Sequence, residues 1–169
     1  AAAAVGLLLG ETPELIAQGL VSYQASGMRQ NIYEQDGYQI YADCYNASPD
    51  AMEATLSVLG GMAGDGRRFA VLGSMLELGD YAEEGHRRAG RAAAQYADAL
   101  YAYGPDAAAM VAGAREKGME HAYAFDDQTA LVVALREDAK KGDALLFKGS
   151  RGMRMERALA MFLGEEVEA

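Results

Sequence analysis

The chain has 169 residues, of which 51% are hydrophobic, and a formal net charge of −10 at pH 7. This length and composition suffice for one well-buried domain and a short additional segment. The acidic balance argues against nucleic-acid partners and anionic membrane surfaces, both of which favour a basic face. It suits a soluble protein that binds small molecules. The single cysteine, Cys44, allows no intrachain disulfide, so a reducing cytoplasmic location is expected.

The amino-terminal segment predicts two short helices. Residues 1–9 are rich in alanine and leucine and end before a glycine, a usual helix-stopping residue. Thr12 and Pro13 supply an N-cap and a first position for a second helix, which has ended by Ser26-Gly27. The first run is too short to span a membrane and has no basic residues before it, unlike a signal peptide. Since two such helices cannot bury all their apolar faces, we expect the chain to begin inside a longer protein.

From Asn31 onward the pattern predicts alternating strands and helices. Asp36-Gly37 lies between two β-prone runs and predicts a hairpin. Ser48-Pro49 predicts the start of a helix. Further strands are expected at 69–72, 99–103, 121–125 and 143–147, and further helices at 81–96, 106–117, 129–140 and 153–163. This alternation is typical of an α/β fold with a mainly parallel sheet flanked by helices.

Polar clusters follow two of the expected strands. Lys148-Gly149-Ser150-Arg151 follows the last strand, and a second cluster begins at Asp43. Ligands of parallel sheets gather beyond the carboxyl ends of the strands. Ser150 is expected to cap the following helix, and the guanidinium of Arg151 suits a carboxylate or a phosphate. Taken alone, the Lys148 cluster is explained more simply by a capped helix with solvated charges.

Motifs for several common chemistries are absent from the sequence. There is no G-x-G-x-x-G, no G-x-x-x-x-G-K-[ST], and no Cys/His cluster with metal-ligand spacing. His121 is isolated, and His86, in a charged helical stretch, is expected to be a surface imidazole. Cys44, the single cysteine, is expected to be a spectator thiol. The residues alone describe an α/β module that runs no hydrolytic or phosphoryl-transfer reaction unaided.

Four segments, in the right order, resemble the Mur ligase family, and within it the ligases that add D-alanyl-D-alanine to a UDP-N-acetylmuramoyl-tripeptide. The helical start and Gly27-Met28-Arg29 are similar to the family's helix pair and P-G-R, although the proline is lacking here. The other three are 43–52, similar to D-x-Y-N-A-N-P-x-S-M; 71–79 with His86, similar to L-G-D-M-x-E-L-G…H; and 147–151 with Met155-Glu156, similar to V-K-G-S-R…M-E. Ser74 stands where the family commonly has an acidic residue.

The resemblance implies a domain organisation and an activity. Residues 1–28 would be the helical tail, or remnant, of a central ATP-binding domain, and 29–169 the Rossmann-like carboxyl-terminal domain. The whole enzyme would phosphorylate the tripeptide carboxylate with ATP, and the amine of D-alanyl-D-alanine would then attack the acyl phosphate. The phosphate loop and the Mg ligands would lie upstream, so this fragment is expected to be inactive alone. Closure onto the central domain would bring the dipeptide and complete the ATP site.

The resemblance also implies roles for individual residues on the nucleotide side. Arg29 would bind the nucleotide phosphates, and Asp43 would accept hydrogen bonds from the ribose hydroxyls. Tyr45 and Asn46 would line the nucleotide side of the interdomain cleft.

On the dipeptide side, Ser150 and Arg151 would hold the carboxylate of D-alanyl-D-alanine, with Lys148 in support. Glu77 is expected to orient its loop, with His86 as its candidate partner. Two alternatives stay open: another superfamily amino-acid ligase, similar to folylpolyglutamate synthetase, or a stand-alone anion- or nucleotide-binding module.

Overall fold

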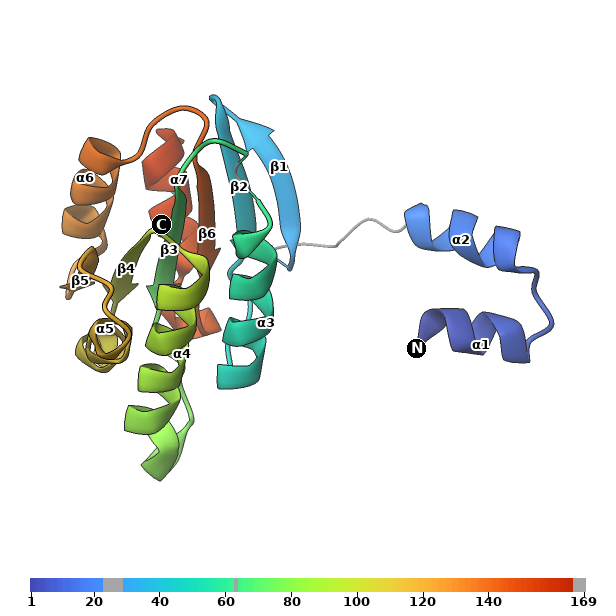
Figure 1. Cartoon of the computed structure of the whole chain (residues 1–169), viewed down its shortest axis with the longest axis horizontal. Coiled ribbons are helices and arrows are strands. Elements are labelled where there is room, and N and C mark those ends of the chain that lie inside the picture. The colour runs from blue at the N-terminus through green and yellow to red at the C-terminus, as the bar shows by residue number, and fades with distance from the viewer. Residues whose placement is uncertain (23–28, 63, 166–169) are drawn as a thin grey trace.

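The computed structural model describes residues 1–22, 29–62 and 64–165. Two helices, α1 (Ala2–Leu8) and α2 (Pro13–Val21), pack on each other and lie apart from the sheet (Figure 1). The Thr12 hydroxyl caps α2 by accepting the Leu15 N–H at 3.3 Å, as the sequence predicts. The expected end at Ser26-Gly27 and the domain boundary after residue 28 fall outside the described residues.

No helix in the described part of the chain is both long and apolar enough to cross a bilayer.

In the described residues, six strands form one mixed, mostly parallel sheet, which confirms the predicted α/β class (Figure 1). The order across the sheet is β1-β2-β6-β3-β4-β5, and only β1 runs antiparallel to its neighbour. The strands are β1 (Asn31–Gln35), β2 (Tyr38–Asp43), β3 (Arg68–Gly73), β4 (Ala99–Tyr103), β5 (Ala122–Phe125) and β6 (Ala144–Lys148). The β1–β2 turn uses Asp36 at φ 54° and Gly37 at φ 88°, the left-handed pair that a tight hairpin requires.

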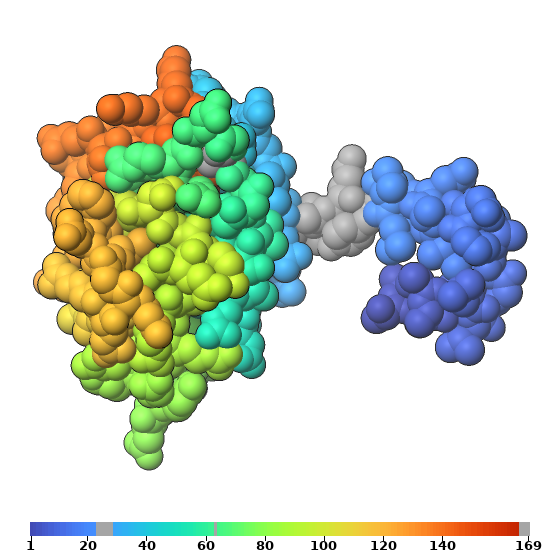
Figure 2. All heavy atoms as spheres, in the orientation of Figure 1, coloured from blue at the N-terminus to red at the C-terminus, as the bar shows by residue number. Residues whose placement is uncertain are grey.

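Helices cover both faces of the sheet and enclose two apolar clusters. On one face lie α3 (Pro49–Gly60), α4 (Ala82–Tyr96) and α5 (Ala107–Glu116), whose atoms gather over the face seen in Figure 2. On the other face lie α6 (Gln128–Asp138) and α7 (Met155–Leu163). Short 3-10 turns occupy Gly79–Tyr81 and Arg151–Met153. The two layers of helices leave the four central strands, β2, β6, β3 and β4, largely buried on both sides, as expected of parallel strands, whereas the edge strands β1 and β5 are partly exposed.

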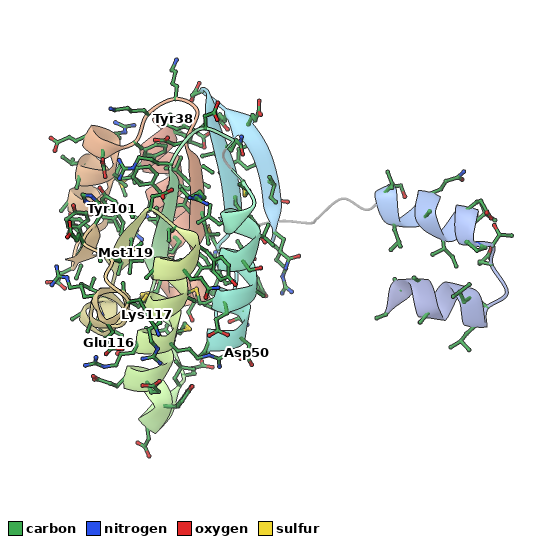
Figure 3. The ribbon with its side chains drawn as sticks, viewed as in Figure 1. Tyr38, Asp50, Tyr101, Glu116, Lys117 and Met119 are labelled. Atoms are coloured by element: carbon green, nitrogen blue, oxygen red, sulfur yellow. The ribbon has the colours of Figure 1, made fainter. Side chains whose placement is uncertain are left out.

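The helices of the first face are also tied together by charge. Arg88 on α4 lies 2.8 Å from Asp50 and 2.5 Å from Glu53, both on α3. Arg91 on α4 lies 3.1 Å from Glu116 on α5, and Figure 3 labels Asp50 and Glu116. Hydrogen bonds from Arg91 and Arg87 lower the pKa of Glu116. Because these arginines have carboxylate partners, the cluster joins three helices rather than forming a basic patch.

The strand order creates a crevice beside β6. Strands β2 and β6 are parallel neighbours, with Asp43 opposite Lys148. The helices that follow them, α3 and α7, lie on opposite faces of the sheet. At the carboxyl ends of β2 and β6 the chain therefore leaves the sheet toward opposite faces, which opens a crevice between the two strand ends. Such switch points are where open α/β sheets bind their ligands.

Candidate functional site

A cleft of about 350 Å³ lies at the carboxyl ends of β2 and β6. It brings together the four residues that the sequence assigned to the nucleotide, and it also includes Lys148. The lining residues are Arg29, Gln30, Asp43, Tyr45, Asn46, Ala51 and Lys148. Residues more than 100 positions apart therefore share one site because β6 returns to pair with β2.

Lys148 lies on the β2 side of the crevice. Its Nζ is 2.5 Å from Asp43 Oδ2 and 2.8 Å from the Asn46 carbonyl oxygen. The lysine is 2% exposed and Asp43 is 7% exposed. A buried ammonium is stable only with such partners, because desolvation of a lone charge costs several kcal/mol. The sequence expectation grouped Lys148 with Ser150 and Arg151, whereas the structure places its ammonium between Asp43 and Asn46.

Asp43 also holds the segment that leads into β1. Its Oδ1 accepts the backbone N–H of Gln30 at 3.2 Å, and its Oδ2 lies 3.4 Å from the Thr55 hydroxyl. Gln30 has φ 51°, an uncommon conformation for a residue with a side chain. The carboxylate thus links β2, β6, α3 and the entrance to β1.

Arg29 and Tyr45 form the exposed rim of the cleft. The Arg29 Cζ lies 3.9 Å from the centre of the Tyr45 ring, a cation–π contact. Tyr45 is 43% exposed, and Arg29 is also exposed. The rim therefore offers a cation and an aromatic face, and the floor offers a carboxylate.

Ser150 does not cap the last helix, so this prediction is wrong. Its hydroxyl accepts the N–H of Leu76 at 2.9 Å, and its own N–H donates to the Ser74 carbonyl at 3.2 Å. Helix α7 begins only at Met155, after a left-handed Arg154, and has no side-chain cap. Ser150 instead ties the end of β6 to the loop after β3, on the side of β6 away from Asp43.

Arg151 lies beside Ser150 and has a carboxylate partner. Its guanidinium pairs with Glu156 on the first turn of α7, and its side chain is 54% exposed. The second carboxylate oxygen of Glu156, Oε2, is the one buried side-chain polar atom without a hydrogen-bond partner in the described part of the chain. In the sequence, Glu156 stands out only as part of the Met155-Glu156 motif. Helix neighbours lie three or four residues apart, so the spacing of five gave no signal for this contact.

His86 is fully buried, so the prediction of a surface imidazole is wrong. Its Nε2 accepts the Met75 N–H at 2.8 Å, and its Nδ1 lies 2.6 Å from the Ala82 carbonyl oxygen. These partners assign the hydrogen to Nδ1. The ring therefore contacts Met75 and Ala82 rather than Glu77, which is exposed at φ 67°. Its role is to fix the loop after β3, which agrees with the structural role that the sequence suggested.

Ser74, at the position where the resemblance leads us to expect an acidic residue, belongs to the same loop. Its Oγ accepts the Asp106 N–H at 3.0 Å and lies 3.4 Å from the Tyr103 carbonyl oxygen. Ser74 thereby joins the loop after β3 to the loop after β4.

Cys44 is 1% exposed, and its Sγ lies 3.4 Å from the Phe147 carbonyl oxygen. Burial, with a smaller effect of the Glu156 charge, raises the pKa of the thiol to about 12. A protonated, enclosed thiol has no nucleophilic role. The described residues contain no group of three or more His, Cys, Asp or Glu side chains that could hold a metal ion.

Comparison with known proteins places this geometry in a family. Residues 28–151 match the model described as Mur ligase, glutamate ligase domain. The UDP-N-acetylmuramoyl-tripeptide–D-alanyl-D-alanine ligase of Bacillus subtilis (strain 168) is 37% identical over 92% of this chain and 35% of its own length. The enzyme of the same name from Escherichia coli (strain K12) is 34% identical over 94% of this chain and 34% of its length.

Solved structures agree with the sequence relatives. The MurF ligase of Thermotoga maritima in complex with ADP is 33% identical, with a TM-score of 0.80 over 96% of this chain and 36% of that one. A bifunctional folylpolyglutamate synthase/dihydrofolate synthase has a TM-score of 0.60 over 89% of this chain and 35% of that one, at 18% identity, which supports a common fold alone. The chain spans about a third of the length of the relatives that it matches.

Proposed function

Because the chain belongs to the Mur ligase family, we propose that it is the carboxyl-terminal domain of an ATP-dependent ligase that adds D-alanyl-D-alanine to UDP-N-acetylmuramoyl-tripeptide in peptidoglycan precursor synthesis. The observation that carries the proposal is the cleft beside β6, where Arg29, Asp43, Tyr45 and Asn46 meet. The identity to D-alanyl-D-alanine-adding ligases favours that substrate over those of other superfamily members.

The chemistry of the cleft fits a nucleoside triphosphate. The Arg29 guanidinium suits the phosphates, and the one lone pair of Asp43 Oδ1 not used by Gln30 can accept a ribose hydroxyl. Tyr45 and Asn46 supply an aromatic face and an amide at the rim and the side of the cleft. ATP supplies the phosphoryl group that activates the tripeptide carboxylate, and these residues bind and orient the nucleotide. That a relative was crystallised with ADP supports this assignment.

Ser150 and Arg151 suit the carboxylate of D-alanyl-D-alanine. Ser150 uses an oxygen lone pair for the Leu76 N–H, which leaves its O–H free to donate to a ligand. The half-exposed Arg151 is held through one nitrogen by Glu156 and keeps further N–H donors for a carboxylate. With the carboxylate fixed, the dipeptide amine can be aimed at the acyl phosphate. Positioning of this kind lowers the barrier by several kcal/mol.

Residues 1–28 are proposed to end a central ATP-binding domain that lies upstream with the phosphate loop and the Mg ligands. The exposure of Leu8, Leu15, Leu20 and Val21 on α1 and α2 supports a partner domain packed on this pair. Closure of the two domains would exclude water from the acyl phosphate. The cytoplasm, where ATP is available, is the proposed location of the enzyme.

The experiment is to clone the complete reading frame that contains residues 1–169 and assay its product. The assay contains ATP, Mg²⁺, UDP-N-acetylmuramoyl-tripeptide and D-alanyl-D-alanine. Mass spectrometry should detect UDP-N-acetylmuramoyl-pentapeptide, and one phosphate should be released for each molecule of it that forms. Residues 1–169 alone are expected to give neither product. L-glutamate with a folate acceptor is the control for the alternative ligase class. A frame that begins near Ala1 and binds nucleotide without ligation would contradict the proposal and favour the stand-alone module.

A further inference from the structure

Resting on the proposed function, we propose that Lys148 is a positioning residue of the nucleotide cleft and does not contact the dipeptide. Its ammonium bridges the Asp43 carboxylate, at 2.5 Å, and the Asn46 carbonyl oxygen, at 2.8 Å. Both partners belong to residues that line the cleft. One buried cation therefore sets the position of an acceptor for the ribose and of the loop that carries Tyr45.

The topology separates Lys148 from the dipeptide residues. Strand β6 lies between β2 and β3, and the Lys148 side chain bonds to the end of β2 and the loop after it. Ser150 bonds instead to Ser74 and Leu76, in the loop after β3. Lys148 and Ser150, two positions apart at the end of β6, thus bond to opposite neighbouring strands. A carboxylate ligand bound by Ser150 and Arg151 would have to displace Asp43 to reach an ammonium that is 2% exposed.

The effect of Lys148 extends through Asp43 to the entrance of β1. Asp43 Oδ1 accepts the Gln30 N–H at 3.2 Å, and Gln30 is held in a left-handed conformation. Arg29, which precedes it, lies over the Tyr45 ring at 3.9 Å. Without the ammonium, an unpaired buried carboxylate would turn toward solvent and release Gln30. The positions of Arg29 and Asp43 would then change together, although neither residue had been substituted.

The first test separates the two substrates kinetically in the complete ligase. Lys148→Met keeps the length of the side chain and removes its charge, and Lys117→Met, on the exposed end of α5, is the matched control. We expect K148M to raise the KM for ATP by about tenfold or more and to leave the KM for D-alanyl-D-alanine within about twofold. A rise in the dipeptide KM with an unchanged ATP KM would make Lys148 a dipeptide ligand. No change in either KM would also overturn the proposal.

A double variant that removes both buried charges keeps the proposal testable if K148M alone does not fold. In the double variant Asp43→Asn/Lys148→Met, no charge is left buried, so we expect it to fold even where the single variant does not. If Lys148 acts through Asp43, the ATP KM of the double variant should match that of Asp43→Asn alone. If the fold-changes in the ATP KM of the two single variants multiplied in the double variant, the positioning role would be contradicted. Residues that act through one another have non-additive effects on free energy.

Hydrogen exchange gives a readout that does not depend on ligase activity. In residues 1–169, K148M is expected to speed exchange of the Gln30 amide by about tenfold relative to K117M, because Asp43 no longer holds it. An unchanged Gln30 amide would overturn the positioning role. If the wild-type ligase instead forms no pentapeptide while Gln30 responds to K148M, the proposed function fails and the positioning role survives.

Discussion

The hydroxyl of Ser150 accepts the backbone N–H of Leu76 at 2.9 Å, across 74 positions of sequence. This bond joins the end of β6 to the loop after β3. A second hydrogen bond, from the Ser150 N–H to the Ser74 carbonyl oxygen, joins the same two segments. His86 holds the intervening Met75 N–H from α4. The loop after β3 is therefore fixed by tertiary hydrogen bonds at three successive residues.

Ser150→Ala should destabilise the chain by about 1–2 kcal/mol, because the Leu76 N–H loses its acceptor in a part-buried site. Urea unfolding followed by circular dichroism measures the change as a lower midpoint with an unchanged slope. Ser57→Ala, at an exposed position of α3, is the control and should stay within about 0.5 kcal/mol of the wild type. Equal midpoints for the two variants would show that the Leu76 bond contributes nothing to stability.

Arg151→Ala in the complete ligase should raise the KM for D-alanyl-D-alanine by about 10- to 100-fold, the loss of a charged hydrogen bond. The KM for ATP should change far less, because Arg151 is not among the residues that line the cleft of Asp43. Steady-state kinetics with each substrate varied in turn separates the two effects. Arg157→Ala, on the exposed side of α7, is the matched control. An unchanged dipeptide KM in R151A would refute the assignment of Arg151.

Glu156→Gln tests whether the partner of Arg151 aligns it. The substitution keeps the side-chain shape and weakens the ion pair. We expect a rise in the dipeptide KM of a few fold, smaller than for R151A, because an amide oxygen can still accept from the guanidinium. A rise as large as that of R151A would point to direct contact between Glu156 and the dipeptide. Kinetics of the double variant R151A/E156Q distinguishes the two cases.

Cys44 should resist alkylation in the native chain. Its pKa of about 12 leaves roughly one thiol in 10,000 as thiolate at pH 8, and the sulfur is 1% exposed. Mass spectrometry after iodoacetamide treatment should find unmodified native chain and full labelling in 8 M urea, at about pH 8. Because Cys44 is the single cysteine, the mass shift is unambiguous. Rapid labelling of the native chain would contradict the buried position.

Asp138 should make a pH-dependent contribution to stability. Hydrogen bonds from Arg67, and to a smaller extent from Tyr101, lower the pKa of Asp138 although burial acts to raise it. A carboxylate with a lowered folded-state pKa stabilises the native state above its unfolded pKa of about 3.9, and that contribution is lost as pH falls through the folded value. Asp138→Asn should therefore cost about 1 kcal/mol at pH 7 in urea unfolding and progressively less below about pH 4. Exposed Asp126→Asn is the control, and a pH-independent difference for D138N would contradict the linkage.

Local chemistry predicted the local structure well. Asp36-Gly37 predicted the hairpin because a tight turn needs two left-handed residues, and both adopt positive φ. Ser48 caps α3 as expected, since its oxygen needs only an N–H three residues ahead. The strand β4 has the bounds that its apolar run indicates.

The errors concern contacts that the sequence brings together only through the sheet. The residues around Ser150 predict that it caps the following helix. Its hydroxyl accepts instead the N–H of Leu76, which follows another strand, β3. His86 lies among charged residues in the sequence, but its position on α4 turns it inward onto Met75. The role expected for Lys148 beside Ser150 and Arg151 stays a prediction, and strand pairing places the residue opposite Asp43, a contact that the linear sequence does not indicate. The periodicity of hydrophobic residues indicates where strands lie in the sequence but not which strands pair in the sheet.

The position of β6 has a consequence for how the chain acquires its shape. The last of the six described strands fills the centre of the sheet, between β2 and β3, which are both synthesised before it (Figure 1). Until residues 144–148 emerge from the ribosome, β2 and β3 each present an open hydrogen-bonding edge with apolar side chains on both faces. Contacts between segments this distant also form slowly. A chain that stops before β6 would therefore be left with two unjoined pieces and exposed edges prone to aggregation, and no cleft could form between them.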